Sequence, residues 1–171
     1  MTDDYDSPWK EALEQYLAEC LALFFPEVHA NIDWERGYEF LDKELQQVVA
    51  AADLGPRVVD KLVRVWQRGG DETWVLLHLE VQGQAEARFA ERMFVYYYRL
   101  YDRYHRRIAS LAILSDEHLH WRPQQFAEEL WGCQVQFAFP IVKLLDYRDQ
   151  LPALEANRNP FVAVLLAHLG A

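Results

Sequence analysis

Two spacings of hydrophobic residues alternate along the chain, one typical of helices and the other of strands. Apolar residues recur at helical spacing over residues 9–24, and Pro26 follows, so this segment predicts an amphipathic helix. Residues 38–53 show a similar spacing and are followed by Gly55-Pro56, a pair typical of a helix end. The chain therefore begins with two predicted helices.

Two strand-like segments come next. Residues 58–66 are rich in β-branched side chains, and residues 73–82 form a second apolar run of strand length. Gly69-Gly70-Asp71 lies between them and has the composition of a turn. This pattern predicts an antiparallel hairpin.

The rest of the chain predicts further helices and strands. A helix is expected over residues 85–104, strands over 108–115 and 133–139, and helices over 141–157 and 160–169. No internal repeat, low-complexity tract or linker interrupts the pattern. We therefore expect a single α/β domain in which helices pack around one sheet.

Composition agrees with one compact domain. The chain has 171 residues, of which 51% are hydrophobic and 26% are charged. No apolar run approaches the roughly 20 residues that span a bilayer, and residues 1–9 are acidic where a signal peptide would be basic and then apolar. We expect a cytoplasmic protein with no membrane partner. Cys20 and Cys133 lie far apart and outside any zinc-binding spacing, so both are predicted to be buried free thiols.

The net charge of −10 is concentrated in one part of the chain. Residues 1–55 carry 13 acidic and 3 basic residues, whereas residues 56–107 carry 7 acidic and 10 basic residues. A uniformly acidic protein would repel nucleic acid, but the middle third of this chain is mildly basic. The net charge therefore leaves a polyanionic partner open.

Polar side chains gather on one face of the second predicted strand. Because side chains two positions apart in a strand point the same way, His78, Glu80 and Gln82 share a face. In the predicted hairpin, Asp60 falls opposite residues 80–82. Two adjacent carboxylates repel unless a cation neutralises them, and oxygen ligands suit Mg²⁺, so one interpretation is a divalent-metal site.

The other interpretation is a structural ion-pair network. Asp60 would then pair with Lys61 or Arg64, and Glu80 with an arginine of the predicted helix at 85–104. Four arginines of that helix fall within a sector of about 60°, which predicts a basic stripe able to bind phosphates. The stripe comprises Arg88, Arg92, Arg99 and Arg103. A row of aromatic residues on the same helix fits either core packing or base stacking.

The segments HLEVQGQ (78–84) and RMFVYYYR (92–99) are the most specific part of a wider resemblance. From about residue 5 to residue 169 the chain resembles the recombination-promoting nuclease (YhgA-like transposase) family, a branch of the PD-(D/E)XK nuclease superfamily. The resemblance implies a restriction-endonuclease-like fold, a central mixed β-sheet flanked by helices, as a single domain over residues 1–171. It also implies a metal site formed by Asp60 and the motif Glu80-Val81-Gln82.

The motif departs from the superfamily pattern at one position. Gln82 stands where the superfamily has lysine and resembles the Glu-x-Gln variant of this branch; an amide orients a water molecule but supplies no charge. The superfamily also tends to use a carboxylate on the first helix. Glu11 and Glu14 are the candidates for that role, and the sequence leaves the choice open.

Two functions remain as hypotheses. The first is a Mg²⁺- or Mn²⁺-dependent DNA endonuclease in which Asp60, Glu80 and the Val81 carbonyl hold the ion and Gln82 positions the attacking water. The residues predicted to contact DNA are Arg64, Arg92 and Arg99.

The second hypothesis is a catalytically inactive nuclease-like scaffold that acts as an interaction or assembly domain. It is favoured by Gln82 in place of lysine, by the acidic first third and by a chain that ends earlier than the family leads us to expect. In both cases a homodimer is one expectation. The apolar segment 161–169 either joins two copies or covers the chain's own core.

Overall fold

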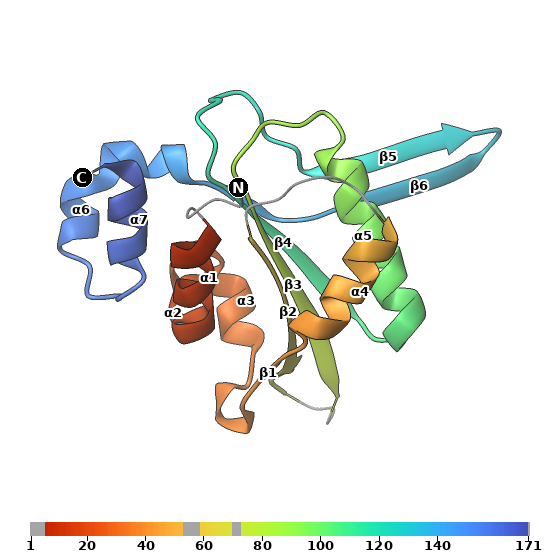
Figure 1. The fold of residues 1–171 in the computed structure, drawn as a ribbon, viewed down its shortest axis with the longest axis horizontal. Coiled ribbons are helices and arrows are strands. Elements are labelled where there is room, and N and C mark those ends of the chain that lie inside the picture. The colour runs from red at the N-terminus through yellow and green to blue at the C-terminus, as the bar shows by residue number, and fades with distance from the viewer. Residues whose placement is uncertain (1–5, 53–58, 70–72, 171) are drawn as a thin grey trace.

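The computed structural model describes residues 6–52, 59–69 and 73–170. In these residues a five-stranded mixed sheet lies between two groups of helices, and a separate two-stranded hairpin projects from one side (Figure 1). This confirms the predicted fold class. The helices are α1 (Asp6–Gln15), α2 (Leu17–Phe24), α3 (Pro26–Asn31), α4 (Asp42–Ala52), α5 (Phe89–Tyr104), α6 (Leu151–Glu155) and α7 (Val162–Leu169), with the 3-10 turns η1 (Trp34–Arg36) and η2 (Leu144–Gln150). The strands are β1 (Glu39–Phe40), β2 (Val59–Trp66), β3 (Trp74–Gln82), β4 (Ile108–Leu114), β5 (Gln125–Leu130), β6 (Cys133–Ala138) and β7 (Ile141–Lys143).

The main sheet has the strand order β1-β2-β3-β4-β7. β1, β2 and β3 are antiparallel neighbours, which confirms the predicted hairpin, although residues 70–71 of its turn lie outside the described residues. β3 and β4 are parallel, and α5 forms the crossover between them, as a parallel pair requires. β7 is the second parallel neighbour of β4.

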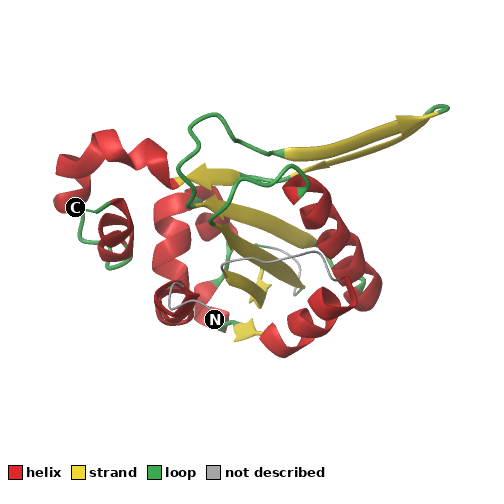
Figure 2. Ribbon diagram, turned by 45° about the horizontal axis from the view of Figure 1, so that its top comes forward, coloured by secondary structure: helices red, strands yellow, loops and turns green. Residues whose placement is uncertain are grey.

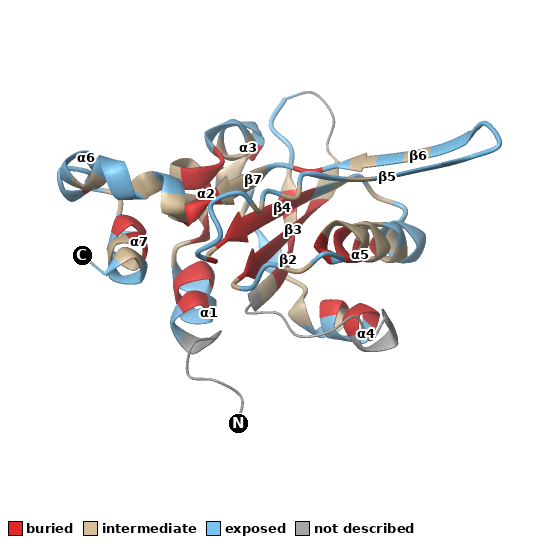
Figure 3. Ribbon diagram, turned by 90° about the horizontal axis from the view of Figure 1, so that it is seen from above, coloured by how far each residue is buried: buried red, intermediate tan, exposed pale blue. Residues whose placement is uncertain are grey.

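The two faces of the sheet are covered by different helices (Figure 2). The N-terminal helices pack with α7 on one face, together with Leu77, Leu79 and Val81 of β3. On the other face, α4 and α5 contribute Val48, Tyr96 and Leu100 to a cluster that includes Leu62 and Leu76. Burial is therefore concentrated in the strands between the two groups of helices (Figure 3).

The N-terminal half departs from the predicted helices in two places. The first predicted helix is divided at Tyr16, whose backbone angles (φ −128°, ψ 41°) are not helical. The break lets Leu13 of α1 and Leu17 and Leu21 of α2 all reach the core. The second helix begins at Asp42 rather than residue 38, because Glu39 and Phe40 pair with the edge of β2. Its predicted end at Gly55-Pro56 lies outside the described residues.

The C-terminal half contains the larger corrections. The segment 141–157 was predicted to be one helix, but Ile141–Lys143 pairs with β4 as β7, and η2 and α6 follow. The predicted strand at 133–139 is present as β6, but it pairs with β5 in the separate hairpin rather than in the main sheet. Cys133 lies on this hairpin and is exposed, so its predicted burial was wrong; Cys20 is buried as predicted. The last helix is confirmed as α7.

The described helices include none that is both long enough and apolar enough to cross a lipid bilayer. The longest, α5, is amphipathic: one side is buried, and the other carries exposed charged and aromatic side chains.

Candidate active site between the sheet and α5

The polar side chains of β3 lie on the face of the sheet that α5 covers. His78, Glu80 and Gln82 are all buried there, as their spacing along the strand predicts. The His78 ring meets Tyr96 of α5 edge-on, with ring centroids 5.7 Å apart. A group of polar side chains is thus enclosed between a strand and a helix, where each needs a polar or charged partner.

Asp60 is the direct partner of Glu80 in the antiparallel ladder between β2 and β3. Side chains at such opposed positions have Cβ atoms about 4.5–5.5 Å apart. Asp60 is partly buried, and Glu80 has 0% of its surface exposed. The structure therefore brings together the two carboxylates that the hairpin spacing placed opposite each other.

Arg92 of α5 reaches into this group from the helix. Its Nη2 donates hydrogen bonds to Glu80 Oε1 (2.9 Å) and to Gln82 Oε1 (2.7 Å). Its Nη1 donates to Glu86 Oε2 at 2.8 Å. The Arg92 side chain is 2% exposed, so in this structure it does not lie on a surface that DNA can contact, contrary to the predicted role. It instead makes the pair that the ion-pair interpretation expected between Glu80 and an arginine of this helix.

Gln82 is held at both ends of its amide. Its Oε1 accepts from Arg92, and its Nε2 donates to the backbone oxygen of Gln84 at 2.7 Å. The side chain was predicted to position a water molecule, but here its amide orients the guanidinium. The motif residue and the helix arginine therefore form one unit with Glu80.

The structure places the first-helix carboxylate elsewhere. Lys61 Nζ donates to Glu14 Oε1 (2.5 Å) and to Asp42 Oδ2 (2.8 Å), and Lys61 is 1% exposed. Neighbouring residues of a strand point to opposite faces, so this cluster and Asp60 leave β2 on different sides. Glu14 thus neutralises a buried lysine, and the other candidate, Glu11, lies on an exposed part of α1.

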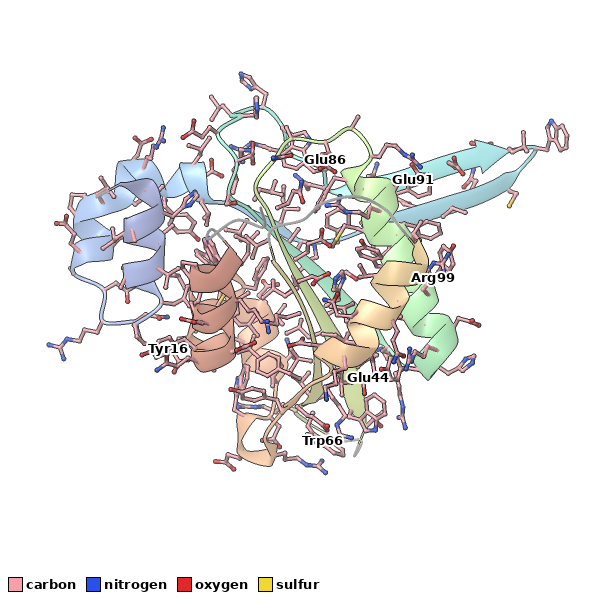
Figure 4. All side chains as sticks on the ribbon, viewed as in Figure 1. Tyr16, Glu44, Trp66, Glu86, Glu91 and Arg99 are labelled. Atoms are coloured by element: carbon pink, nitrogen blue, oxygen red, sulfur yellow. The ribbon has the colours of Figure 1, made fainter. Side chains whose placement is uncertain are left out.

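Arg64 and the remaining arginines of the predicted stripe lie apart from one another. Arg64 lies on β2 and pairs with Glu39 at 2.7 Å on the surface. Arg99 lies farther along α5, beside α4, while Glu86 lies on the segment that leads into α5 (Figure 4). Arg99 is partly buried and Arg88 and Arg103 are exposed, so the four arginines of the stripe lie in different environments.

A second buried ion pair was not predicted. Lys143 Nζ, at the end of β7, donates to both carboxylate oxygens of Asp116 at 2.8 Å and to the Trp121 carbonyl oxygen at 3.0 Å. Both side chains are at most 1% exposed. A lone lysine in the apolar run Ile141–Leu145 was the signal in the sequence, because a charge in such a run needs a buried partner.

The donor chemistry near Asp60 and Glu80 fits a divalent cation. Two carboxylates on adjacent strands supply the oxygen ligands that Mg²⁺ and Mn²⁺ prefer. In the part of the chain that the structure describes, no group of three or more His, Cys, Asp or Glu side chains is arranged to hold a metal ion. An ion at this pair would take its other ligands from main-chain, water or phosphate oxygens, as Mg²⁺ commonly does.

Comparison with known proteins identified no family for this chain. A scan against models of protein families, a search of curated proteins and a search of solved structures each found no match. Function is therefore inferred from the residues and their arrangement.

Proposed function

We propose that this protein is a metal-dependent nuclease that hydrolyses phosphodiester bonds in DNA, with Asp60 and Glu80 as ligands of Mg²⁺ or Mn²⁺. The observation that carries the proposal is the direct pairing of these two carboxylates on neighbouring strands. Gln82 follows on the same face and completes a Glu-x-Gln motif. The resemblance of this motif to that of the YhgA-like family supports the same chemistry.

Each side chain has a separate task in this proposal. A bound divalent ion lowers the pKa of a water ligand and neutralises charge that develops on the phosphate. Asp60 and Glu80 hold the ion, and their rigid cross-strand pairing fixes the distance between the two ligands. Gln82 holds Arg92 at the motif position where the superfamily carries its lysine.

Arg92 supplies the positive charge that position 82 lacks. Its guanidinium contacts both Glu80 and Gln82, so a cation lies beside the motif although no residue of the motif is positively charged. A guanidinium stays protonated at all working pH values, so it stabilises an anion but cannot serve as a general base. In this proposal Arg92 therefore neutralises Glu80 and holds Glu80 and Gln82 in place from the buried side of the site, without touching the DNA.

The contact to DNA is assigned to Arg64. Arg64 lies on β2 on the same side as Asp60, because the two residues are an even number of positions apart. It is partly exposed and pairs with Glu39 on the surface. Exposed ion pairs contribute about 0–1 kcal/mol, so Arg64 can exchange the Glu39 carboxylate for a backbone phosphate at little cost in free energy.

Nicking of supercoiled plasmid tests the catalytic proposal. Purified protein is incubated with DNA in the presence of Mg²⁺, Mn²⁺ or EDTA, and the rate is compared with those of Asp60→Asn and Glu80→Gln. These variants keep the side-chain shape but remove the charged ligand. We expect each to lower the metal-dependent rate at least about 100-fold.

Glu91→Gln is the matched control. Glu91 is a surface carboxylate of α5 that pairs with Arg88, so its loss should leave the rate within about twofold. Circular dichroism shows whether each variant is folded. Metal-dependent nicking that persists at the normal rate in folded Asp60→Asn and Glu80→Gln proteins would exclude this site.

A second function, a nuclease-like scaffold without activity, is favoured by one observation. Glu80 is completely buried and already neutralised by Arg92, so the group has a structural role without any ion. This function predicts no nicking and no rise in melting temperature with millimolar Mn²⁺. A rise that is absent in Asp60→Asn supports the metal site instead, because a ligand stabilises only the state that binds it.

A further inference from the structure

The hairpin of β5 and β6, here called the arm (residues 125–138), ends in exposed apolar side chains. Trp131 is 96% exposed and Leu130 is 60% exposed. The base of the arm packs on α5: Phe126 stacks on Phe94 with centroids 4.9 Å apart, and Phe137 meets Tyr97 at 4.8 Å. The arm extends away from the rest of the molecule in both views (Figures 1 and 2).

The tip of the arm is a tight turn with an unfavourable residue in it. Leu130 and Cys133 are paired, so the turn consists of Trp131 (φ 51°) and Gly132 (φ 86°). Such two-residue turns favour Asn-Gly, because both positions need positive φ. A bulky residue in this conformation costs about 1 kcal/mol or more. A strained tryptophan held in water on a projecting hairpin points to a recognition role.

A groove between α4 and α5 has the chemistry to receive this tip. The groove (Gln47, Val48, Tyr98, Arg99, Asp102 and Arg103) encloses about 470 Å³. Tyr98 is 44% exposed, and the Arg99 guanidinium lies 5.8 Å from its ring centroid. Aromatic and arginine side chains of this kind are the usual partners of a buried tryptophan at protein interfaces.

Charge distinguishes the partners available to the arm. The arm carries Glu128 and Glu129 and no basic residue, so arm-to-arm pairing would bring like charges together. The acidic tip also disfavours nucleic acid. The groove offers two arginines against one aspartate and is therefore complementary to the arm.

The positions of arm and groove allow two chains to insert their arms into each other's grooves at the same time. The arm and the helix pair α4–α5 lie on the same side of the molecule in both views (Figures 1 and 2). A two-fold axis on that side lets each copy insert its arm into the groove of the other, which closes the assembly at two chains. The geometry points to a homodimer in which two copies of this chain exchange arms, with Trp131 seated in the α4–α5 groove of the partner. This inference is independent of the proposed catalysis.

Replacement of Trp131 by asparagine tests the arm directly. Asparagine favours the turn conformation, so Trp131→Asn removes the indole without weakening the hairpin. The mass of the native protein in solution, measured by light scattering during gel filtration, is expected to be about twice the chain mass of 20.2 kDa. We expect Trp131→Asn to raise the dimer dissociation constant at least about tenfold. Trp121→Phe, a change at a tryptophan off the arm, is the control and should stay dimeric.

A pair of charge reversals tests which surfaces meet. Chain P carries Glu128→Arg and Glu129→Arg, and chain Q carries Arg99→Glu and Arg103→Glu. In the exchanged dimer, a homodimer of P or of Q would place each arm in a groove of the same charge. A heterodimer of P with Q would place each arm in a groove of opposite charge. We expect each variant to be monomeric alone and the equimolar mixture to form heterodimers. Glu155→Arg, a surface reversal on α6, is the control and should leave the homodimer intact.

Several results would overturn the inference. One is a native protein that is monomeric at about 100 µM, far above the dissociation constant of a stable dimer. Another is a dimer that Trp131→Asn and both charge reversals leave unchanged, which would locate the interface elsewhere, for example on α7. A third is a loss of DNA binding in chain Q with no change in mass, which would assign Arg99 and Arg103 to nucleic acid.

Discussion

Arg92 and Glu80 form a fully buried ion pair between α5 and β3, with Nη2 of the arginine 2.9 Å from Oε1 of the glutamate. The same guanidinium also binds Gln82 and Glu86. This single side chain therefore links the first turn of the crossover helix, the segment before it and the central strand.

Removing the arginine is expected to be costly for folding. In Arg92→Met the Glu80 carboxylate keeps its burial but loses the guanidinium, a change that typically costs about 3–5 kcal/mol. Arg88→Met is the matched control, because Arg88 pairs with Glu91 on the surface and its loss should change the free energy of unfolding far less. Urea unfolding measures both. Equal free energies of unfolding for the two variants would contradict the role given to Arg92.

Lys143 and Asp116 should behave as a coupled pair. Lys143→Met leaves a buried carboxylate and is expected to destabilise the fold by about 3–5 kcal/mol. Replacing both residues, as Lys143→Met with Asp116→Leu, removes both charges and should recover part of that loss. A thermal or urea double-mutant cycle checks this. Simple additivity of the two single effects would show that the pair is not coupled.

The surface pair of Arg122 and Asp146 predicts a small acid sensitivity. The two hydrogen bonds from the Arg122 guanidinium hold the pKa of the Asp146 carboxyl below its ordinary value. A depressed pKa in the folded state contributes stability above the unfolded pKa of about 3.9, and this contribution is lost as the pH falls further. Asp146→Asn should therefore be less stable than the native chain at pH 7, by about 1 kcal/mol at most because the pair is exposed. Urea unfolding from pH 7 to pH 3 should show the gap closing below about pH 4; a gap that stays constant would contradict the assignment.

The two cysteines should differ sharply in reactivity. Burial raises the pKa of the Cys20 thiol, so little of the reactive thiolate forms, while Cys133 is exposed on the arm. In dilute native protein, a thiol reagent should label Cys133 rapidly and Cys20 only after unfolding. Cys133→Ser should abolish the rapid phase. A rapid phase that survives in this variant would mean that Cys20 is accessible.

The cross-strand pair of Asp60 and Glu80 followed from the sequence because antiparallel register is fixed by counting from a turn. The environment of Arg92 did not follow. Helical spacing placed Arg92, Arg99 and Arg103 on one helix, but only the structure shows that Arg88 precedes this helix and that its first turn lies over polar residues of β3. A charge is stable in that position because Glu80 and Gln82 are beneath it, and this depends on tertiary packing.

The C-terminal strands were harder to predict for a related reason. β5 contains Glu128 and Glu129 and has no clear alternation, because most of the arm is exposed on both faces. β7 has three residues, too few to show a period, and it is a strand only because β4 offers an unpaired edge. Local pattern carries little information where one or both faces meet water or where a neighbour determines the conformation.

The parallel pairing of β4 with β7 joins two strands that are synthesised at different times. The ribosome releases β4 before β7, with the arm and its flanking loops made in between. Until Ile141–Lys143 arrives, Ala112, Ile113 and Leu114 present an open apolar edge on which another nascent chain can pair. This edge of β4 therefore stays open to such pairing until residues 141–143 have been synthesised and have paired with it.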